Sequence, residues 1–294
     1  MQNGGLRSSG ITKKSTDEKP LISVVTVVYN GEATLEQTIL SVVSQTYENV
    51  EYIIVDGGSK DGTIDIIKKY ECKIDYWQSE PDRGIYDAMN KGIGLALGEW
   101  IYIIGADDFF VDENVINELS DLFIGSYDVI SGTVWAVNSK GFQYAFDNNY
   151  SRTIDEDNMY GISAPHQGIF IRRKIMNKYL FDIKYNIAAD LKLNLQLWGD
   201  RALKIKKVKN KIAYYSCEGT SGKNIKKRTQ ETKEILKEFN CENLAHVYLS
   251  KDKSFIMKIK KLFSNNTIIM CLKVFFHKMY KHKCRWEKCP YCQH

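Results

Sequence analysis

Short, almost uninterrupted runs of β-branched and apolar residues constrain the fold of this chain more than any other feature. The clearest runs are residues 21–28, 51–55 and 100–104. A strand that reads as a continuous apolar run is buried on both faces, as in parallel sheets covered by helices. Residues 33–45 and the segment after Asp61 lie between these runs and have apolar side chains at helical spacing. The alternation predicts βαβ units, so we expect an α/β fold built on a mostly parallel sheet flanked by helices.

The second half of the chain alternates less regularly. Residues 128–146 are rich in β-forming residues but irregular, and a helix with apolar residues at near-helical spacing follows Asp190. Further strands are expected at residues 73–78, 165–171 and 206–215, and a charged helix at residues 224–239.

The positive charge of the chain is concentrated near its C-terminal end. The whole sequence has a net charge of +5, whereas residues 251–288 alone contain eleven Lys or Arg against two acids, so the remainder is mildly acidic. In residues 255–263 and 268–280, lysines flank large apolar side chains, as in helices that lie on anionic membranes. We expect residues 241–294 to form a basic amphipathic helical tail that contacts an anionic membrane surface and not nucleic acid. A solvated tail, or a helix packed on the body, is the alternative.

Neither the N-terminal segment nor the cysteines indicate secretion. Residues 1–19 are rich in Gly, Ser and Lys and lack the apolar centre of a signal peptide, so we expect a disordered leader. The seven cysteines are odd in number and scattered, unlike a secreted disulfide framework. A cytoplasmic protein is therefore expected, attached peripherally to the inner face of the membrane if the tail binds there. A zinc site is one interpretation of four soft ligands near the C-terminal end, and free exposed thiols are the favoured alternative. The four residues are Cys284, Cys289, Cys292 and His294.

Polar side chains follow three of the predicted strands where each strand ends. They are Tyr29 and Asn30, then Asp56, then Asp107 and Asp108. In open α/β sheets, ligands bind beyond the carboxyl ends of the strands. Adjacent carboxylates repel each other, and a hard divalent cation that also binds phosphate oxygens would relieve that repulsion. A turn or a helix cap is the alternative reading of the acidic pair.

Two nucleotide-binding signatures are absent from the sequence. The first strand is not followed by Gly-x-Gly-x-x-Gly, which argues against a dinucleotide site, and there is no Gly-x-x-x-x-Gly-Lys-Ser/Thr phosphate loop. The first strand ends in Tyr29-Asn30 instead of a glycine-rich loop, which disfavours a nucleotidyltransferase.

Four motifs occur in the order and spacing of family 2 glycosyltransferases. They are Ser23-Val-Val-Thr-Val-Val-Tyr-Asn30, Val55-Asp-Gly-Gly-Ser-Lys-Asp-Gly-Thr63, Glu80-Pro-Asp-Arg-Gly-Ile-Tyr-Asp-Ala-Met-Asn-Lys-Gly92 and Gly105-Ala-Asp-Asp108. Over about residues 21–215 the sequence resembles the bacterial exopolysaccharide subgroup, including enzymes similar to those of colanic acid synthesis. The resemblance implies a GT-A, Rossmann-like domain over residues 20–240, with a donor half at about 20–125 and an acceptor half at about 126–240.

The resemblance also implies residue roles. It assigns nucleotide-sugar contacts to Tyr29, Asn30, Asp56, Asp82, Arg83 and Asp107. Asp56 matches the acid that contacts the base, and Arg83 lies in a loop expected to close on the donor, where it would pair with a phosphate. Asp108, with Asp107 beside it, matches the site of a divalent metal, Mn²⁺ or Mg²⁺. The motif here is not a literal Asp-x-Asp, which leaves open which carboxylate binds the cation.

Two residues of the second half complete the expected site. The resemblance points to Asp190, in Ile187-Ala-Ala-Asp-Leu191, as the general base that takes the proton of the acceptor hydroxyl. A helix N-cap is the alternative role for Asp190. His166 matches a recurrent position of the subgroup near the acceptor or the metal, with a hydrogen-bonded structural histidine as the alternative.

The implied function is metal-dependent, inverting transfer of a sugar by direct displacement. The donor would be a nucleoside diphosphate sugar, and the acceptor a glycan or lipid-linked saccharide in surface polysaccharide biosynthesis. Two other classes remain as alternatives. One is a sugar-nucleotide-binding protein without turnover, which the intact carboxylate set disfavours. The other is a basic membrane or nucleic-acid adaptor, which only the tail supports.

Overall fold

The computed structural model describes residues 1–137, 143–146, 165–216, 219 and 224–240. Within these residues, ten strands form one mixed sheet in the order β1-β4-β3-β2-β5-β9-β7-β10-β6, and β8 pairs with β7 at one side of this path. The strands are β1 (Gln2–Gly4), β2 (Ile22–Val28), β3 (Val50–Asp56), β4 (Tyr76–Ser79), β5 (Trp100–Gly105), β6 (Phe109–Phe110), β7 (Val129–Val137), β8 (Gln143–Phe146), β9 (Ile169–Arg172) and β10 (Ile205–Ser216).

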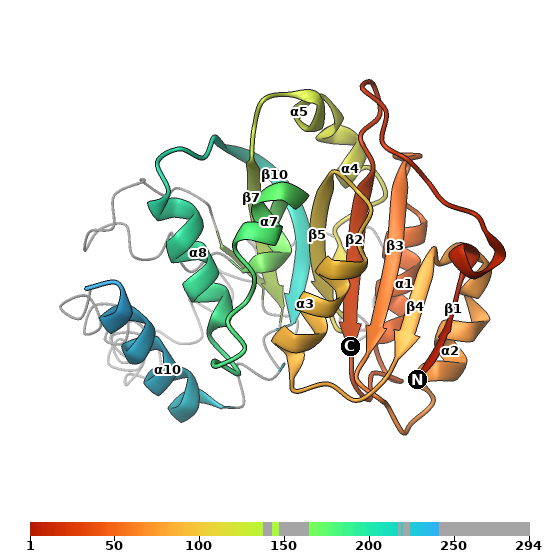
Figure 1. Ribbon diagram of the computed structural model, residues 1–294, viewed down its shortest axis with the longest axis horizontal. Coiled ribbons are helices and arrows are strands. Elements are labelled where there is room, and N and C mark those ends of the chain that lie inside the picture. The colour runs from red at the N-terminus through yellow and green to blue at the C-terminus, as the bar shows by residue number, and fades with distance from the viewer. Residues whose placement is uncertain (138–142, 147–164, 217–218, 220–223, 241–294) are drawn as a thin grey trace, which may run out of the picture.

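Helices cover both faces of this sheet. The α-helices are α1 (Leu35–Val43), α2 (Thr63–Lys69), α3 (Ile85–Leu95), α4 (Val115–Glu118), α5 (Ser120–Ile124), α7 (Arg173–Lys178), α8 (Ala189–Gly199) and α10 (Ile225–Glu238). The short 3₁₀ helices are η1 (Leu6–Ser9), η2 (Glu71–Lys73) and η3 (His166–Gly168). Figure 1 shows α3 and α7 in front of the sheet and α1 behind it.

The central strands are parallel and buried on both faces, as the sequence predicts. β2 pairs in parallel with β3 on one side and with β5 on the other, and β3 pairs in parallel with β4. Successive side chains of a strand point to opposite faces. Val25 and Val27 accordingly join the core under α3 and α8, whereas Ile22, Val24 and Val28 join the core under α1. Two apolar surroundings favour apolar residues at most positions of a strand, and the buried polar residues of β2 are hydrogen-bonded to side chains of β3.

The second half of the chain adds antiparallel pairs to the sheet. β9 lies between β5 and β7 and is antiparallel to both, while β10 is parallel to β7. The expected strand at residues 165–171 begins as η3 and becomes extended only from Ile169. The expected strand at residues 73–78 likewise starts later, at Tyr76, after η2. The α/β class and the mostly parallel centre of the sheet are confirmed.

The expectation of a disordered leader is wrong for the start of the chain. Residues 2–4 form β1, which pairs antiparallel with β4. The Arg7 guanidinium forms an ion pair with Glu51, which is buried, and donates to the Leu95 carbonyl oxygen at 2.9 Å. Composition alone suggested disorder, but the edge of β4 supplies backbone partners and the buried carboxylate supplies a counter-charge.

Among the residues that the structure describes, no helix has both the length and the apolar character needed to cross a bilayer. The expected basic tail at residues 241–294, with Cys284, Cys289, Cys292 and His294, lies outside the described residues.

Arg7→Ala is expected to destabilise the protein. Glu51 would keep its bonds from the Ser23 hydroxyl and the Leu97 N–H but lose the cation that neutralises it. Breaking a buried ion pair from one side costs roughly 3 kcal/mol. Urea unfolding measures the change, with Arg201→Ala, which removes an exposed arginine, as the control. Equal unfolding midpoints for the two variants would show that the Arg7–Glu51 pair contributes nothing to stability.

Candidate functional site

The parallel register brings the predicted polar segments to one edge of the sheet. Val28 is the partner of Asp56, and Val27 is the partner of Gly105, so β2, β3 and β5 end at nearly the same level. The loops that continue from these strands therefore leave from neighbouring points at the lower edge of the sheet in Figure 1. The structure thus gathers the strand-end residues named from the sequence on one side of the domain.

Asp56 is fully buried and organises the loop that follows it. Its Oδ2 accepts hydrogen bonds from the N–H groups of Gly58 and Ser59, each at 3.0 Å, and from the Ser79 hydroxyl at 2.6 Å. The Ser59 hydroxyl donates to Oδ1. Gly58 has φ of +83°, a conformation that favours glycine. The carboxylate is thereby nearly saturated with donors, and it holds the loop in a fixed shape.

Tyr29, Asn30 and Asp82 lie around this loop. The Asn30 N–H donates to the Ser59 hydroxyl at 2.7 Å, and Asn30 Oδ1 accepts from the Lys60 N–H at 3.0 Å. A Cβ atom added at Gly57 would lie 2.3 Å from Asp82 Oδ2 and 3.4 Å from Tyr29 Cδ2. The side chains of Asp82 and Tyr29 therefore approach the Gly57 backbone so closely that no larger residue fits there. Burial, with the charges of Asp87 and Asp56 nearby, raises the pKa of Asp82.

Arg83 is paired within its own segment. Its guanidinium contacts Asp87 Oδ1 at 2.9 Å, its N–H donates to Asp87 Oδ2 at 3.0 Å, and its side chain is largely exposed. The pair lowers the pKa of Asp87. The structure therefore places Arg83 on Asp87 through one guanidinium nitrogen, Nη2.

Asp107 and Asp108 turn their carboxylates toward the same glycine. A Cβ at Gly105 would lie 2.8 Å from Asp108 Oδ2 and 3.1 Å from Asp107 Oδ1. Asp108 is buried, and its oxygens accept from the Gln167 side-chain amide at 2.6 Å and the Ser216 N–H at 2.9 Å. Burial, followed by the neighbouring charge of Asp107, raises the pKa of Asp108 far above its ordinary value.

The acidic pair suits a cation that is shared with a ligand. Among the described residues, no group of three or more His, Cys, Asp or Glu side chains is arranged to hold a metal ion by itself. Mg²⁺ and similar ions are commonly bound by one or two carboxylates together with substrate phosphates. Two converging carboxylates, one of them disfavoured as an anion by its surroundings, fit such a cation. Asp107 is the less buried of the two and therefore the more accessible.

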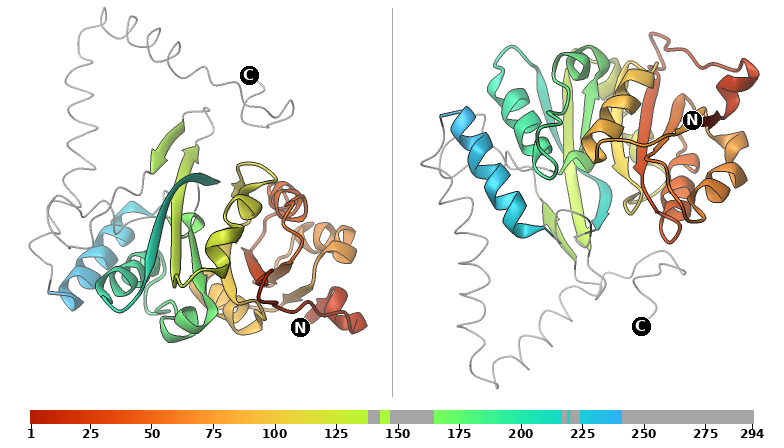
Figure 2. Two further views of the ribbon diagram at one scale, coloured as in Figure 1. Left: turned by 90° about the horizontal axis from the view of Figure 1, so that it is seen from above. Right: turned by 60° about the horizontal axis from the view of Figure 1, so that its bottom comes forward.

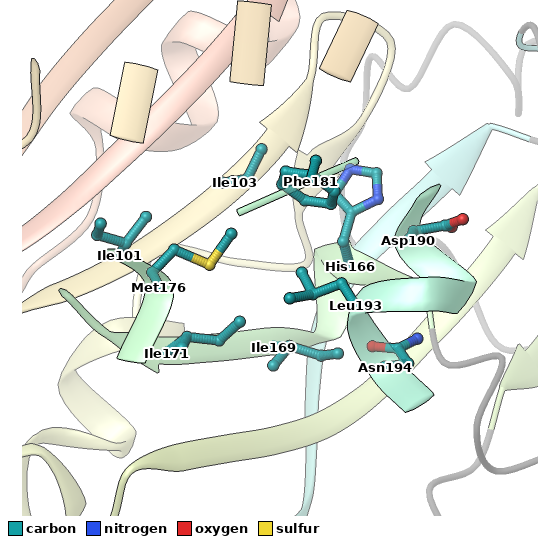
Figure 3. A pocket seen from close by; sticks show the side chains of 10 residues that line it. All are labelled: Ile101, Ile103, His166, Ile169, Ile171, Met176, Phe181, Asp190, Leu193 and Asn194. Atoms are coloured by element: carbon teal, nitrogen blue, oxygen red, sulfur yellow. The ribbon is translucent and has the colours of Figure 1, made fainter. Parts of the chain in front are cut away.

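His166 and Asp190 line one pocket in the second half of the domain. The other walls are mainly apolar, and Figure 3 shows the His166 ring, from η3, near the first turn of α8, which carries Asp190. His166 Nε2 is buried without a hydrogen-bond partner among the described residues. Burial lowers the pKa of His166 to about 4, so the ring is neutral at physiological pH.

Asp190 lies in the first turn of α8 and is not its N-cap. The helix begins at Ala189, and Ala188 is the N-cap. Asp190 Oδ1 accepts from the Leu191 N–H at 2.9 Å and lies 3.2 Å from the Tyr86 hydroxyl. Burial raises the pKa of Asp190, which the Leu191 N–H and the Tyr86 hydroxyl partly oppose. A half-buried carboxylate with a raised pKa is suited to accept a proton.

Gln167 lies between the Asp107–Asp108 pair and the pocket that holds Asp190. The sequence analysis did not identify it as a site residue. Its side chain donates to Asp108, while the preceding His166 lines the pocket with Asp190. Its position next to His166 was the available signal. Tyr86 was also missed as a site residue, although it lies within the third quoted motif and its hydroxyl contacts Asp190.

Comparison with known proteins identifies the family. The family described as Glycosyl transferase family 2 matches residues 23–187, more than half of the chain. A PGL/p-HBAD biosynthesis glycosyltransferase of Mycobacterium tuberculosis is 28% identical over 204 residues, which cover 67% of this chain and 77% of that protein. An uncharacterized glycosyltransferase of the same organism is 31% identical over 58% of this chain and 66% of its own length.

Solved structures share the fold. TarS 1–349 of Staphylococcus aureus in complex with UDP-GlcNAc gives a TM-score of 0.63 at 18% identity, over 81% of this chain and 76% of that one. This chain spans 39% of a longer TarS structure. The mannosyltransferase of Pyrobaculum calidifontis in complex with GDP-Man and Mn²⁺ gives 0.55 at 14% identity, over 96% of this chain and 84% of that one.

The His166 ring is expected to stay neutral across the physiological pH range. With its pKa lowered to about 4 by burial, its ring signals should not shift between about pH 5.5 and pH 8. Heteronuclear NMR of imidazole-labelled protein tests this, with His166→Gln assigning the signals. A titration midpoint near the ordinary value of about 6.5 would show that the ring is solvated instead.

Proposed function

The chain belongs to glycosyl transferase family 2 and is a glycosyltransferase, and we propose that it transfers a sugar from a nucleoside diphosphate sugar to a saccharide or lipid-linked acceptor with inversion at the anomeric carbon. The observation that carries the proposal is the convergence of Asp56 and the Asp107–Asp108 pair at one sheet edge, connected through Gln167 to the pocket that holds Asp190.

The donor would lie over the ends of β2, β3 and β5. The loop held by Asp56, with Tyr29 and Asp82 around it, offers backbone and aromatic surface to a nucleoside. The neighbours of known structure bind UDP-GlcNAc in one case and GDP-Man in the other, which supports a nucleoside diphosphate sugar and leaves the base to experiment.

Asp107, together with Asp108, would hold a divalent cation, Mn²⁺ or Mg²⁺. When bound, such a cation offsets the negative charge of the departing diphosphate. Of the two carboxylates we assign the direct contact to Asp107, because Asp108 is buried and already held by Gln167 and Ser216. This reverses the emphasis that the motif alone suggested.

Asp190 would act as the general base. The acceptor hydroxyl oxygen attacks the anomeric carbon as the bond from that carbon to the diphosphate oxygen breaks, and the hydroxyl proton passes to Asp190. The nucleoside diphosphate leaves with the electron pair of the broken bond. The apolar walls around His166 exclude water, which would otherwise compete with the acceptor. His166 is neutral, so it presents a polar atom there without adding charge.

For the acceptor, we propose a glycan or lipid-linked saccharide of surface polysaccharide biosynthesis, as the resemblance of the four motifs implies. Contact with an anionic membrane on the cytoplasmic side fits the basic and apolar sequence of residues 241–294, which lie outside the described residues.

Carboxylate variants test the proposal directly. With a panel of UDP-, GDP- and dTDP-sugars and a mixture of saccharide acceptors, we expect Mn²⁺- or Mg²⁺-dependent release of one nucleoside diphosphate. Asp190→Asn should lower kcat by about 10²–10⁴-fold, as expected for loss of a general base. Asp107→Asn should abolish the dependence of this release on metal. Chelation of the metal with EDTA should lower the activity of the wild-type protein to the level of this variant.

Asp121→Asn, which changes an exposed acid on α5, is the matched control and should behave as wild type. Metal-dependent donor binding without turnover on any acceptor would favour a sugar-nucleotide-binding protein. Folded protein that binds no sugar nucleotide would refute the donor site.

The pH dependence of the transfer rate should reflect the raised pKa of Asp190. The base acts only when ionised, and burial raises its pKa, so kcat should fall with decreasing pH at a higher pH than an ordinary aspartate would give. A steady-state pH profile at saturating donor and acceptor measures this limb. Asp190→Asn should remove the limb from the residual activity, and a limb that persists in this variant would assign it to another group.

A further inference from the structure

Helix α10 lies beyond the part of the chain that defines the family, yet it packs on the proposed catalytic half. The family match ends at residue 187, whereas α10 spans Ile225–Glu238. Figures 1 and 2 show α10 beside α8 in each view. Ile235 and Leu236 are fully buried in the core cluster that also contains residues of α3 and α8. Helix α10 therefore shares one core with α3 and α8.

The buried acid of α10 is aimed at that turn. Glu231 is 6% exposed. Its Oε1 accepts from the Asn186 N–H at 3.0 Å, and its Oε2 accepts from the N–H groups of Ile187 at 2.8 Å and Ala188 at 3.0 Å. One carboxylate thus binds three consecutive backbone donors that lead into α8.

Glu231 fixes the chain where it enters α8. Ala188 occupies the N-cap of α8 and has no acceptor in its side chain. Glu231 accepts from the Ala188 N–H and from the two N–H groups before it, and a negative charge near a helix N-terminus is favourable. The Leu191 N–H, in the first turn of α8, is bonded by Asp190 Oδ1 instead.

The same peptide segment is held from its other side. The Tyr86 hydroxyl, on α3, lies 2.9 Å from the Ile187 carbonyl oxygen and 3.2 Å from Asp190 Oδ1. The N–H of Ile187 donates to Glu231 on α10, and the carbonyl oxygen of Ile187 accepts from Tyr86 on α3. Two elements therefore fix the backbone of the residue three positions before Asp190. Fixing this turn sets the direction in which Asp190 leaves the first turn of α8.

We infer that Glu231 is a positioning residue for Asp190, and that α10 is an integral part of the acceptor-side machinery. The inference rests on the proposed role of Asp190 as the general base. Glu231 does not touch substrate; it holds the 186–188 turn so that the Asp190 carboxylate meets the acceptor hydroxyl. Misplacement of a reacting group by about 1 Å can cost on the order of 10²-fold in rate.

Glu231→Gln, compared with Glu234→Gln, tests the inference. Gln keeps the size of the side chain but has one acceptor oxygen in place of two. Glu234 is on the same helix and bonds only locally in the described contacts, to Gln230 at 3.0 Å, so its variant matches the charge change without touching the turn.

We expect Glu231→Gln to lower kcat by roughly 10–100-fold with the donor KM within about twofold of wild type. Amide exchange by mass spectrometry should speed up in the 186–188 turn, and the acid limb of the pH profile should shift because the surroundings of Asp190 change. Glu231→Asp, which keeps the charge at shorter reach, should recover part of the rate. Glu234→Gln should match wild type in all of these measurements.

Two results would overturn the inference. One is kinetics for Glu231→Gln equal to those of Glu234→Gln. The other is a rate loss that follows thermal stability alone, with unchanged exchange at the turn and an unchanged pH profile. If Glu231→Gln does not fold, Glu231→Asp measured below its unfolding temperature decides by the same criteria. Wild-type protein that transfers no sugar would instead refute the proposed function, whereas active wild type with unaffected Glu231 variants refutes only the positioning role.

Discussion

Parallel pairing of β2 with β3 and β5 is the constraint on which the site depends. Because the strands run in one direction and in matched register, their carboxyl ends deliver Asp56 and the Asp107–Asp108 pair to one edge. Burial on both faces favours apolar residues along these strands, and the acids of the proposed donor site lie where the strands stop. The position of the acids is therefore a consequence of how the sheet is buried.

Placing acids at a buried edge creates an electrostatic cost that the second half of the domain reduces. Asp108 is buried beside Asp107, and the donors to its carboxylate include Gln167 and the Ser216 N–H, which follow Asp108 in sequence by 59 and 108 residues. These donors come from η3 and the end of β10. The two halves are thus electrostatically interdependent: the first supplies the carboxylates and the second supplies donors to them. A divalent cation shared with a diphosphate would offset the remaining charge.

Local sequence patterns predicted the elements better than the contacts between them. The buried strands, the helices between them and the acids at the strand ends follow from apolar spacing, which each segment carries within itself. The prediction of a disordered N-terminal segment was wrong because Glu51, the partner of Arg7, is 44 residues away, and no local sequence pattern indicates this contact. Glu231 was hidden for the same reason. On a charged helix it looks like any solvated acid, and only the fold shows that it faces the turn before Asp190. From the sequence, Asp190 could be either a general base or a helix N-cap. The start of α8 at Ala189 excludes the N-cap position for Asp190.

The residues that support the two parts of the proposed site lie in different parts of the chain. The acids of the proposed donor site lie within residues 23–187, the part that matches the family, and the strands of the sheet position them. Asp190 lies just beyond that match, in a turn held by Glu231 from α10 and by Tyr86 from α3. Strand ends give a rigid platform, which suits a nucleotide and its phosphates. A turn held by side chains from two helices depends instead on how those helices pack. In the proposed mechanism, the donor side therefore rests on the strand ends, and the acceptor side rests on the packing of α3, α8 and α10.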